Sequence, residues 1–236
     1  MSEPIRPSTV FPATRTPFTV TTEDGEVLIG EVSRPLENPT AAILCCHPNP
    51  TGGGMMDSHI YKKASNRLPA MAGITVVRFN TRGTTSEAGT STGRYDNGRA
   101  EKYDVEAMVR YCFDALQITE LWVVGWSFGT SIAISHARDA RIKGLILLSP
   151  TLLDIEDGDL EFWAKDGRPI TALIPEHDDY LKPDQAEIRF AVIPQINLIA
   201  VEGAKHLWVG EPSVNRVLSE ITRIVAPMRL PLPTEF

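Results

Sequence analysis

The chain has 236 residues, of which 42% are hydrophobic and 22% are charged, and its formal net charge at pH 7 is −7. Such a length and composition are typical of one large globular domain whose core needs neither disulfides nor a metal ion. The acidic balance argues against a nucleic-acid partner, because proteins that bind nucleic acids usually carry a basic excess.

Targeting and cysteine signals point to a reducing compartment. Segment 1–17 is rich in proline and has no apolar run of the kind found in signal peptides. No apolar run approaches the roughly 18 residues of a membrane span, so we expect no membrane partner. Cys45, Cys46 and Cys112 show neither metal-ligand spacing nor a disulfide framework. The sequence therefore predicts buried free thiols in a cytoplasmic protein.

The chain begins with a predicted antiparallel hairpin. Two β-like runs, Phe18–Thr22 and Glu26–Ser33, flank Asp24-Gly25, which is a strong hairpin signal. The wholly apolar run Ala41–Cys46 follows, as expected of a strand buried on both faces. Residues 47–54 are too rich in proline and glycine for a regular element and are predicted to form a loop.

From residue 59 onward, predicted helices and strands alternate. The expected helices cover 59–71, 99–116, 130–138, 183–193 and 214–226, and the expected strands cover 74–79, 121–124, 144–148, 170–174 and 196–201. Residues 82–98 are predicted to be a loop, and 154–167 to hold at most one short helix. Ser213 is the predicted N-cap of the closing helix.

This alternation predicts an α/β fold, with a mainly parallel central sheet, an N-terminal antiparallel hairpin and helices on both faces. We expect one domain over 18–226, with proline-rich terminal segments at 1–17 and 227–236, the second of which has no predicted structure. Ligands of such sheets bind beyond the carboxyl ends of the parallel strands.

A sharp turn with serine at its apex follows the strand predicted at 121–124. The residues are Gly125-Trp126-Ser127-Phe128-Gly129, and a helix is predicted directly afterwards. A serine on a strained strand-to-helix turn exposes its hydroxyl, and the flanking glycines allow strand and helix to cross closely. Ser127 is therefore a candidate nucleophile.

Two other candidate residues follow later strands. His206 follows the last predicted strand and is a candidate base for Ser127. Asp178 is the preferred carboxylate partner of that histidine, with Asp179 and Glu176 as alternatives. Because the carboxyl ends of parallel strands meet at one edge of the sheet, we expect these side chains to converge.

The serine turn and the order Ser, Asp, His resemble the nucleophile elbow and catalytic triad of the α/β-hydrolase superfamily. His47-Pro48-Asn49-Pro50 resembles the His-Pro-x-Pro oxyanion loop of small bacterial serine hydrolases. The resemblance implies that Ser127, Asp178 and His206 are catalytic and that no cofactor takes part.

An oxyanion hole needs two backbone N–H donors. The resemblance implies that Phe128, directly after the nucleophile, supplies one of them. Between the two prolines of the loop only Asn49 has an N–H, so Asn49 is the second expected donor, with 52–54 as an alternative source. His47 is expected to stabilise the loop by hydrogen bonds, the alternative being a second base.

The predicted activity is hydrolysis of small carboxylic esters through an acyl-enzyme. Cleavage of amides, peptides or thioesters would use the same triad and remains an alternative. A second alternative is a catalytically silent hydrolase-fold protein that binds a ligand. A small-molecule ester or amide is thus the expected partner, and the sequence carries no indication of oligomeric state.

The segment available for a lid is short. Residues 151–169 separate two predicted strands and are acidic, with few large apolar side chains. Such a segment cannot build a lid with its own core, so we expect a shallow, open cleft and short acyl substrates. The predicted walls of this cleft are Trp126, Phe128, Leu207, Trp208 and Met55. The turn at 80–83 is expected to shape the rim.

Overall fold

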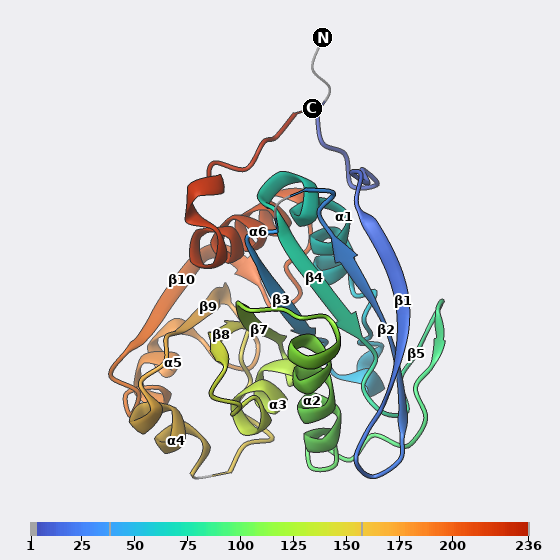
Figure 1. Cartoon of the computed structure of the whole chain (residues 1–236). Helices are drawn as coiled ribbons and strands as arrows, with labels where there is room; N and C mark the ends of the chain where they lie inside the picture. The colour runs from blue at the N-terminus through green and yellow to red at the C-terminus, as the bar shows by residue number, and fades with distance from the viewer. Residues whose placement is uncertain (1–3, 38, 157, 236) are drawn as a thin grey trace.

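The computed structural model describes residues 4–37, 39–156 and 158–235. Its centre is an eight-stranded sheet (Figure 1). In spatial order the strands are β1 (Thr14–Thr21), β2 (Val27–Arg34), β4 (Ile74–Phe79), β3 (Ala41–Cys46), β7 (Leu121–Trp126), β8 (Ile142–Leu148), β9 (Ile170–His177) and β10 (Ile196–Lys205).

The predicted fold class is confirmed. β1 and β2 form the antiparallel hairpin around Asp24-Gly25, and β2 also pairs antiparallel with β4. All other pairings in the large sheet are parallel. The wholly buried strands β3 and β4 lie inside the sheet, which explains why their sequences show no alternation of polar and apolar residues.

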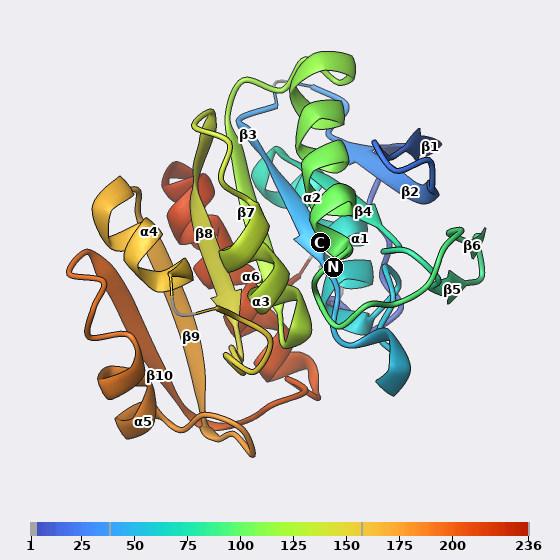
Figure 2. The same ribbon diagram turned by 90° about the horizontal axis from the view of Figure 1, so that it is seen from below.

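Helices cover both faces of the sheet (Figures 1 and 2). One face packs against α1 (His59–Ala72) and α6 (Glu211–Val225). The other packs against α2 (Glu101–Arg110), α3 (Phe128–His136), α4 (Asp159–Asp166) and α5 (Pro183–Arg189). Each face buries its own apolar cluster, so adjacent strand residues such as Cys45 and Cys46 belong to opposite clusters.

Several element boundaries differ from the prediction. The helix predicted at 99–116 begins at Glu101 and ends in a π-helical turn, η2 (Tyr111–Ala115). The buried carboxylate of Glu101 accepts hydrogen bonds from the N–H groups of Asp96 and Gly98, which fixes the start of the helix. The loop predicted at 82–98 contains a small two-stranded sheet, β5 (Thr85–Ser86) and β6 (Gly89–Thr90).

The chain ends also carry more structure than predicted. β1 begins at Thr14, inside the proline-rich segment 1–17 and before the predicted start at Phe18. The last helix begins at Glu211 with Gly210 at its N-cap, so Ser213 is not the cap. A short 3₁₀ turn, η3 (Pro227–Arg229), follows this helix. The N–H of Ile5 donates to the carbonyl of Thr234 at 2.9 Å, so the two terminal segments lie side by side (Figure 1).

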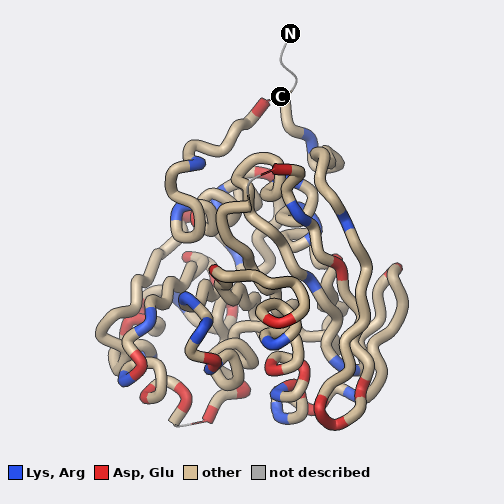
Figure 3. Tube along the Cα trace, in the orientation of Figure 1, with Lys and Arg blue, Asp and Glu red and all other residues tan. Residues whose placement is uncertain are grey.

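Charged residues lie mainly around the periphery. Figure 3 shows lysine and arginine interspersed with aspartate and glutamate along the trace, whereas the central strands carry few charges. Within the described part of the chain, no helix combines the length and apolar character that a membrane span needs. The predicted cytoplasmic location stays a prediction.

Candidate active site

Ser127 occupies a strained turn between β7 and α3. Its backbone has φ 54° and ψ −119°, a conformation that non-glycine residues rarely adopt. A Cβ on Gly125 would lie 2.4 Å from the carbonyl oxygen of Gly129, and a Cβ on Gly129 would lie 1.9 Å from that of Cys46. Only glycine fits at both positions, and this close crossing holds the serine at the apex of the turn.

A hydrogen-bonded chain of three buried side chains begins at this serine. Oγ of Ser127 lies 2.9 Å from Nε2 of His206, and Nδ1 of His206 lies 2.9 Å from Oδ2 of Asp178. With Asp178 ionised, Nδ1–H donates to the carboxylate, and Nε2 accepts from the serine hydroxyl. The strand ends of β7, β9 and β10 thus bring these three residues together.

The environment of Asp178 keeps it ionised. Burial alone would raise the pKa of this carboxyl, but hydrogen bonds from His206 and from the N–H groups of Tyr180 and Leu181 outweigh it, so the pKa lies below its usual value. Asp179 is exposed, and Glu176 accepts a hydrogen bond from the N–H of Gly203 instead. Neither alternative carboxylate contacts His206.

The loop after β3 lies against the start of α3. The carbonyl oxygens of Cys46 and His47 would be 1.9 Å and 2.8 Å from a Cβ at Gly129, so this loop passes directly over the helix N-terminus. Within the described residues, the N–H groups of Asn49 and Phe128 have no acceptor. Both N–H groups are therefore free to donate to a bound group.

The alternative oxyanion donors at 52–54 are occupied. The N–H groups of Gly52 and Gly54 donate to the carbonyl of Asn49, at 3.0 Å and 2.9 Å, and that of Gly53 donates to the carbonyl of Pro50 at 3.1 Å. These bonds close a 3₁₀ turn, η1 (Pro50–Gly52), which the sequence pattern did not predict. The side chain of Asn49 caps the turn, because its Oδ1 accepts hydrogen bonds from the N–H and the hydroxyl of Thr51.

His47 fixes this loop from inside. Its Nδ1–H donates to the carbonyl of Pro48 at 2.7 Å, and its Nε2 accepts from the N–H of Thr81 at 3.0 Å. Burial lowers the pKa of this imidazole to about 4, so it is neutral at physiological pH. Both ring nitrogens are thus committed to the loop. Thr81, expected only to shape the rim, anchors the loop after β3 through His47.

Two predicted cleft walls are wrong. Trp126 is 2% exposed and Trp208 is fully buried, and both pack in the apolar cluster beneath the sheet with α1 and α6. Trp126 is the last residue of β7, and strand alternation directs its side chain into that cluster beside Val124. Neither tryptophan can contact a substrate at the surface.

The other predicted walls have different environments. Leu207 is 55% exposed and lines a cavity of about 260 Å³ together with His206. Phe128 is buried, with its ring edge-on to Tyr95 at 5.3 Å. Met55 is half-buried in the loop before α1, where its N–H donates to Ser58 Oγ.

Sequence reasoning missed Tyr180. Its ring lies 4.6 Å from the imidazole of His206, centroid to centroid, and its side chain is 55% exposed. The signal available in the sequence was its position two residues after Asp178, within the turn that follows β9. This aromatic side chain packs against the imidazole of His206.

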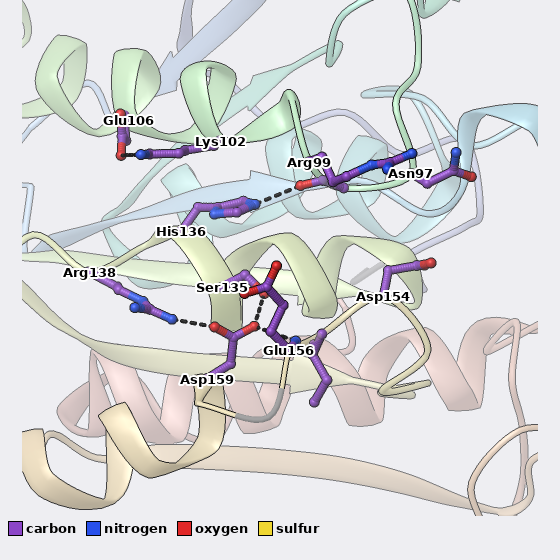
Figure 4. Close-up of a pocket in the computed structure, with 12 residues that line it drawn as sticks. Asn97, Arg99, Lys102, Glu106, Ser135, His136, Arg138, Asp154, Glu156 and Asp159 are labelled. Atoms are coloured by element: carbon purple, nitrogen blue, oxygen red, sulfur yellow. Dashed lines mark hydrogen bonds and ion pairs between the residues drawn. The ribbon is translucent and has the colours of Figure 1, made fainter.

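A larger cavity lies outside the triad. It measures about 690 Å³ and is lined by α2, α3 and the loop before α4 (Figure 4). Its polar groups are mostly satisfied by one another: Asp159 binds Arg138 and Ser135, and His136 Nε2–H donates to the carbonyl of Gly98 at 2.6 Å. Ser127, Asp178 and His206 are not among its lining residues.

Comparisons with solved structures give the same fold. An α/β serine hydrolase homologue from Coxiella burnetii is 24% identical, with 92% of this chain and 100% of that chain covered and a TM-score of 0.75. An α/β serine hydrolase without lid from Xanthomonas campestris is 23% identical, with 93% and 99% covered and a TM-score of 0.73. A Pyrococcus furiosus esterase is 18% identical, with 89% and 93% covered and a TM-score of 0.70.

No curated protein sequence matches the chain. A family model described as the alpha/beta hydrolase fold matches residues 41–172, which include β3, the serine turn and the start of β9. The match covers more than half of the sequence, and the strand order and the neighbouring structures agree with it. The chain belongs to the α/β hydrolase fold family.

Proposed function

We propose that the protein is a serine hydrolase that cleaves small carboxylic esters through an acyl-enzyme. The observation that carries this proposal is the continuous hydrogen-bonded chain from Ser127 Oγ through His206 to Asp178, with 2.9 Å at both contacts. In this arrangement a buried carboxylate orients an imidazole whose free nitrogen accepts the serine proton. Serine hydrolases and an esterase among the structural neighbours support the same reaction class.

The first half-reaction forms the acyl-enzyme. Ser127 Oγ attacks the ester carbonyl carbon while its proton moves to Nε2 of His206. The N–H groups of Asn49 and Phe128 donate to the resulting oxyanion. When the tetrahedral intermediate collapses, the bond to the alkoxy oxygen breaks, and the alcohol leaves with the proton from His206. Asp178 stays ionised and stabilises the imidazolium.

The second half-reaction returns the free enzyme. Water attacks the acyl carbon and gives one proton to His206 Nε2, and the same two N–H groups bind the oxyanion. Collapse breaks the bond between the acyl carbon and Ser127 Oγ, which regains its proton from His206. The carboxylic acid leaves, so one water is consumed and no other reactant is needed.

The structure of the segment between β8 and β9 supports the proposal that the substrates are short. Its only described helix, α4, packs on α3 rather than over the serine, because the fully buried Trp163 lies in the core and donates Nε1–H to the carbonyl of Ile134 at 2.8 Å. The Xanthomonas neighbour is also described as having no lid. We therefore propose an open site that takes short, water-soluble acyl esters.

A fluorophosphonate probe tests the proposal most directly. The wild-type chain should be labelled covalently, mass spectrometry should identify the peptide that contains Ser127, and Ser127→Ala should abolish labelling. Matched p-nitrophenyl ester, thioester and anilide substrates then separate the chemistries, with the highest kcat/KM expected for the ester. An intact, folded chain that neither reacts with the probe nor hydrolyses any of the substrates would mean a ligand-binding protein without catalytic activity.

A further inference from the structure

The backbone carbonyl of His206 accepts two hydrogen bonds inside the protein. The indole Nε1–H of Trp126 donates to this oxygen at 3.1 Å, and the hydroxyl of Ser149 donates to it at 3.1 Å. Trp126 is the last residue of β7, and Ser149 directly follows β8. A carbonyl oxygen has two lone pairs, so these two donors fill its acceptor capacity. Neither contact takes part in the reaction described above.

The indole of Trp126 is held in a fixed orientation. The ring of His59 meets it edge-on at 5.2 Å and 87°, and the ring of Tyr61 does so at 6.2 Å and 88°. His59 Nε2–H also donates to the carbonyl of Trp208 at 3.2 Å, just beyond His206. The ring that donates to His206 is therefore fixed by α1, and α1 holds the same loop at a second point.

The backbone conformation of Ser149 directs its hydroxyl toward the carbonyl of His206. Its φ is 47°, in the left-handed region that non-glycine residues rarely adopt, and its side chain is fully buried. Its N–H donates to the carbonyl of Leu173 in β9 at 3.0 Å. Strained residues of this kind persist where the surrounding structure fixes them, and they concentrate at functional sites.

Besides these two hydrogen bonds, the segment that carries His206 is held at Trp208, which is fully buried and accepts a hydrogen bond from His59. It follows β10, which lies at the edge of the sheet, and Lys205 and Leu207 on either side of His206 are exposed. The Asp178 contact orients the imidazole ring, but it does not fix the backbone from which the ring projects. The two donors to the carbonyl restrain the backbone at His206 itself.

We propose that Trp126 and Ser149 are positioning residues that fix the backbone of His206 and thereby set the distance between His206 Nε2 and Ser127 Oγ. Trp126 is covalently bonded to Ser127, so the strand end that carries the nucleophile also holds its base. A displacement of this strand end moves both groups together and preserves their contact. The inference rests on the proposed roles of Ser127 and His206 as nucleophile and base.

The test compares two variants with two matched controls. Trp126→Phe removes the indole donor but keeps an aromatic ring, and Ser149→Ala removes the hydroxyl donor. Trp163→Phe removes a similar indole bond, from a fully buried tryptophan to the carbonyl of Ile134. Thr222→Val removes a buried hydroxyl that donates to the carbonyl of Leu218 in α6. Neither control contacts His206.

Three quantities are measured for each protein: the second-order rate of fluorophosphonate labelling, kcat and KM for a p-nitrophenyl ester, and the Tm. We expect Trp126→Phe and Ser149→Ala to lower the labelling rate and kcat by roughly 10- to 100-fold, because a displaced base costs about this much, with KM nearly unchanged. The controls should lose a similar amount of Tm and keep the wild-type rates.

Wild-type labelling rates in both Trp126→Phe and Ser149→Ala would overturn the inference, as would equal rate losses in the two controls. If Trp126→Phe does not fold, Ser149→Ala decides the question with Thr222→Val as its control. Absence of labelling at Ser127 in the wild-type chain is a separate result: it contradicts the proposed function itself, and this assignment with it.

Discussion

His206 Nδ1 lies 2.9 Å from Asp178 Oδ2, and Asp178 is only 1% exposed. The other oxygen of this carboxylate accepts from the N–H groups of Tyr180, at 2.8 Å, and Leu181, at 3.3 Å. One carboxylate thus fixes both the tautomer of the imidazole and the turn that follows β9. Exchanging this carboxylate for an amide tests the tautomer without removing the side chain.

Asp178→Asn should lower kcat by roughly 10⁴-fold with little change in KM, because the amide stabilises the wrong tautomer of His206 and cannot stabilise its charged form. Steady-state kinetics on a p-nitrophenyl ester measure the effect. Asp179→Asn is the matched control, since this exposed neighbour does not contact His206, and it should keep near wild-type activity. A large loss of kcat in Asp179→Asn, together with near wild-type kcat in Asp178→Asn, would reverse the assignment of the acid.

Substitutions of Asn49 separate its backbone from its side chain. Asn49→Pro removes the proposed oxyanion donor and should lower kcat by roughly 10²- to 10³-fold. Asn49→Ala keeps the N–H and should change kcat little, but it removes the cap on Thr51 and should cost about 1 kcal/mol of unfolding free energy. Kinetics and denaturant unfolding are measured on both variants. Equal, large losses of kcat would assign the catalytic contribution to the Asn49 side chain.

Burial of His47 makes stability depend on pH. Burial, opposed by the hydrogen bond to Pro48, lowers the pKa of this imidazole from 6.5 to about 4. Between these two values the unfolded chain binds more protons than the folded chain, so the unfolding free energy decreases as the pH falls through this window. The loss attributable to His47 reaches about 3 kcal/mol at most.

Chemical denaturation at a series of pH values measures this loss. His47→Gln removes the titrating group, so its unfolding free energy should decrease less than that of the wild type as the pH falls from 6.5 to 4. Parallel curves for wild type and His47→Gln would contradict the buried, neutral state of His47.

Tyr180 is expected to stabilise the charged form of the base. Its ring lies 4.6 Å from that of His206, where an aromatic face near an imidazolium contributes about 0.5–1 kcal/mol at an exposed position. Tyr180→Ala should therefore lower kcat by roughly two- to five-fold, whereas Tyr180→Phe keeps the ring and should keep the rate. Equal kcat values for Tyr180→Ala and the wild type would show that the ring does not stabilise the charged form of His206.

The open site predicts a limit on acyl length. Each extra buried CH₂ contributes about 0.8 kcal/mol only while it stays out of water, so kcat/KM should level off beyond roughly four to six carbons. A series of p-nitrophenyl esters from acetate to palmitate, each below its solubility limit, measures the dependence. A steady rise out to long chains would instead require a deep apolar tunnel or a lid from another subunit.

The sequence predicted the sheet and the convergence of the three triad candidates because both depend on repeating patterns. The wholly apolar strand β3 appears as an unbroken run, and parallel strands place their following residues at one edge. Ser127 and Asp178 each follow such a strand closely, so their approach to His206 required no side-chain detail. The side-chain contacts around these residues could not be predicted from such patterns.

The environments of Trp126 and Trp208 could not be predicted in this way. Whether a residue at a strand end faces the cleft or the core depends on the sheet face, and Trp208 also has a positive φ, 51°, that no local residue pattern indicates. The link between His47 and Thr81 joins loops after two different strands. Such contacts depend on the relative placement of loops, which propensity and spacing do not determine.

The contact between Ile5 and Thr234 makes the chain suitable for circular permutation. Because the two terminal segments already lie side by side, a short flexible linker can join them without crossing the sheet. New ends can be opened between Ser86 and Gly89, in the exposed turn of the small β5–β6 hairpin. In such a permutant β1 to β4 and the loop that holds His47 would follow Ser127, Asp178 and His206 in the chain, while all of them keep the same positions in the fold.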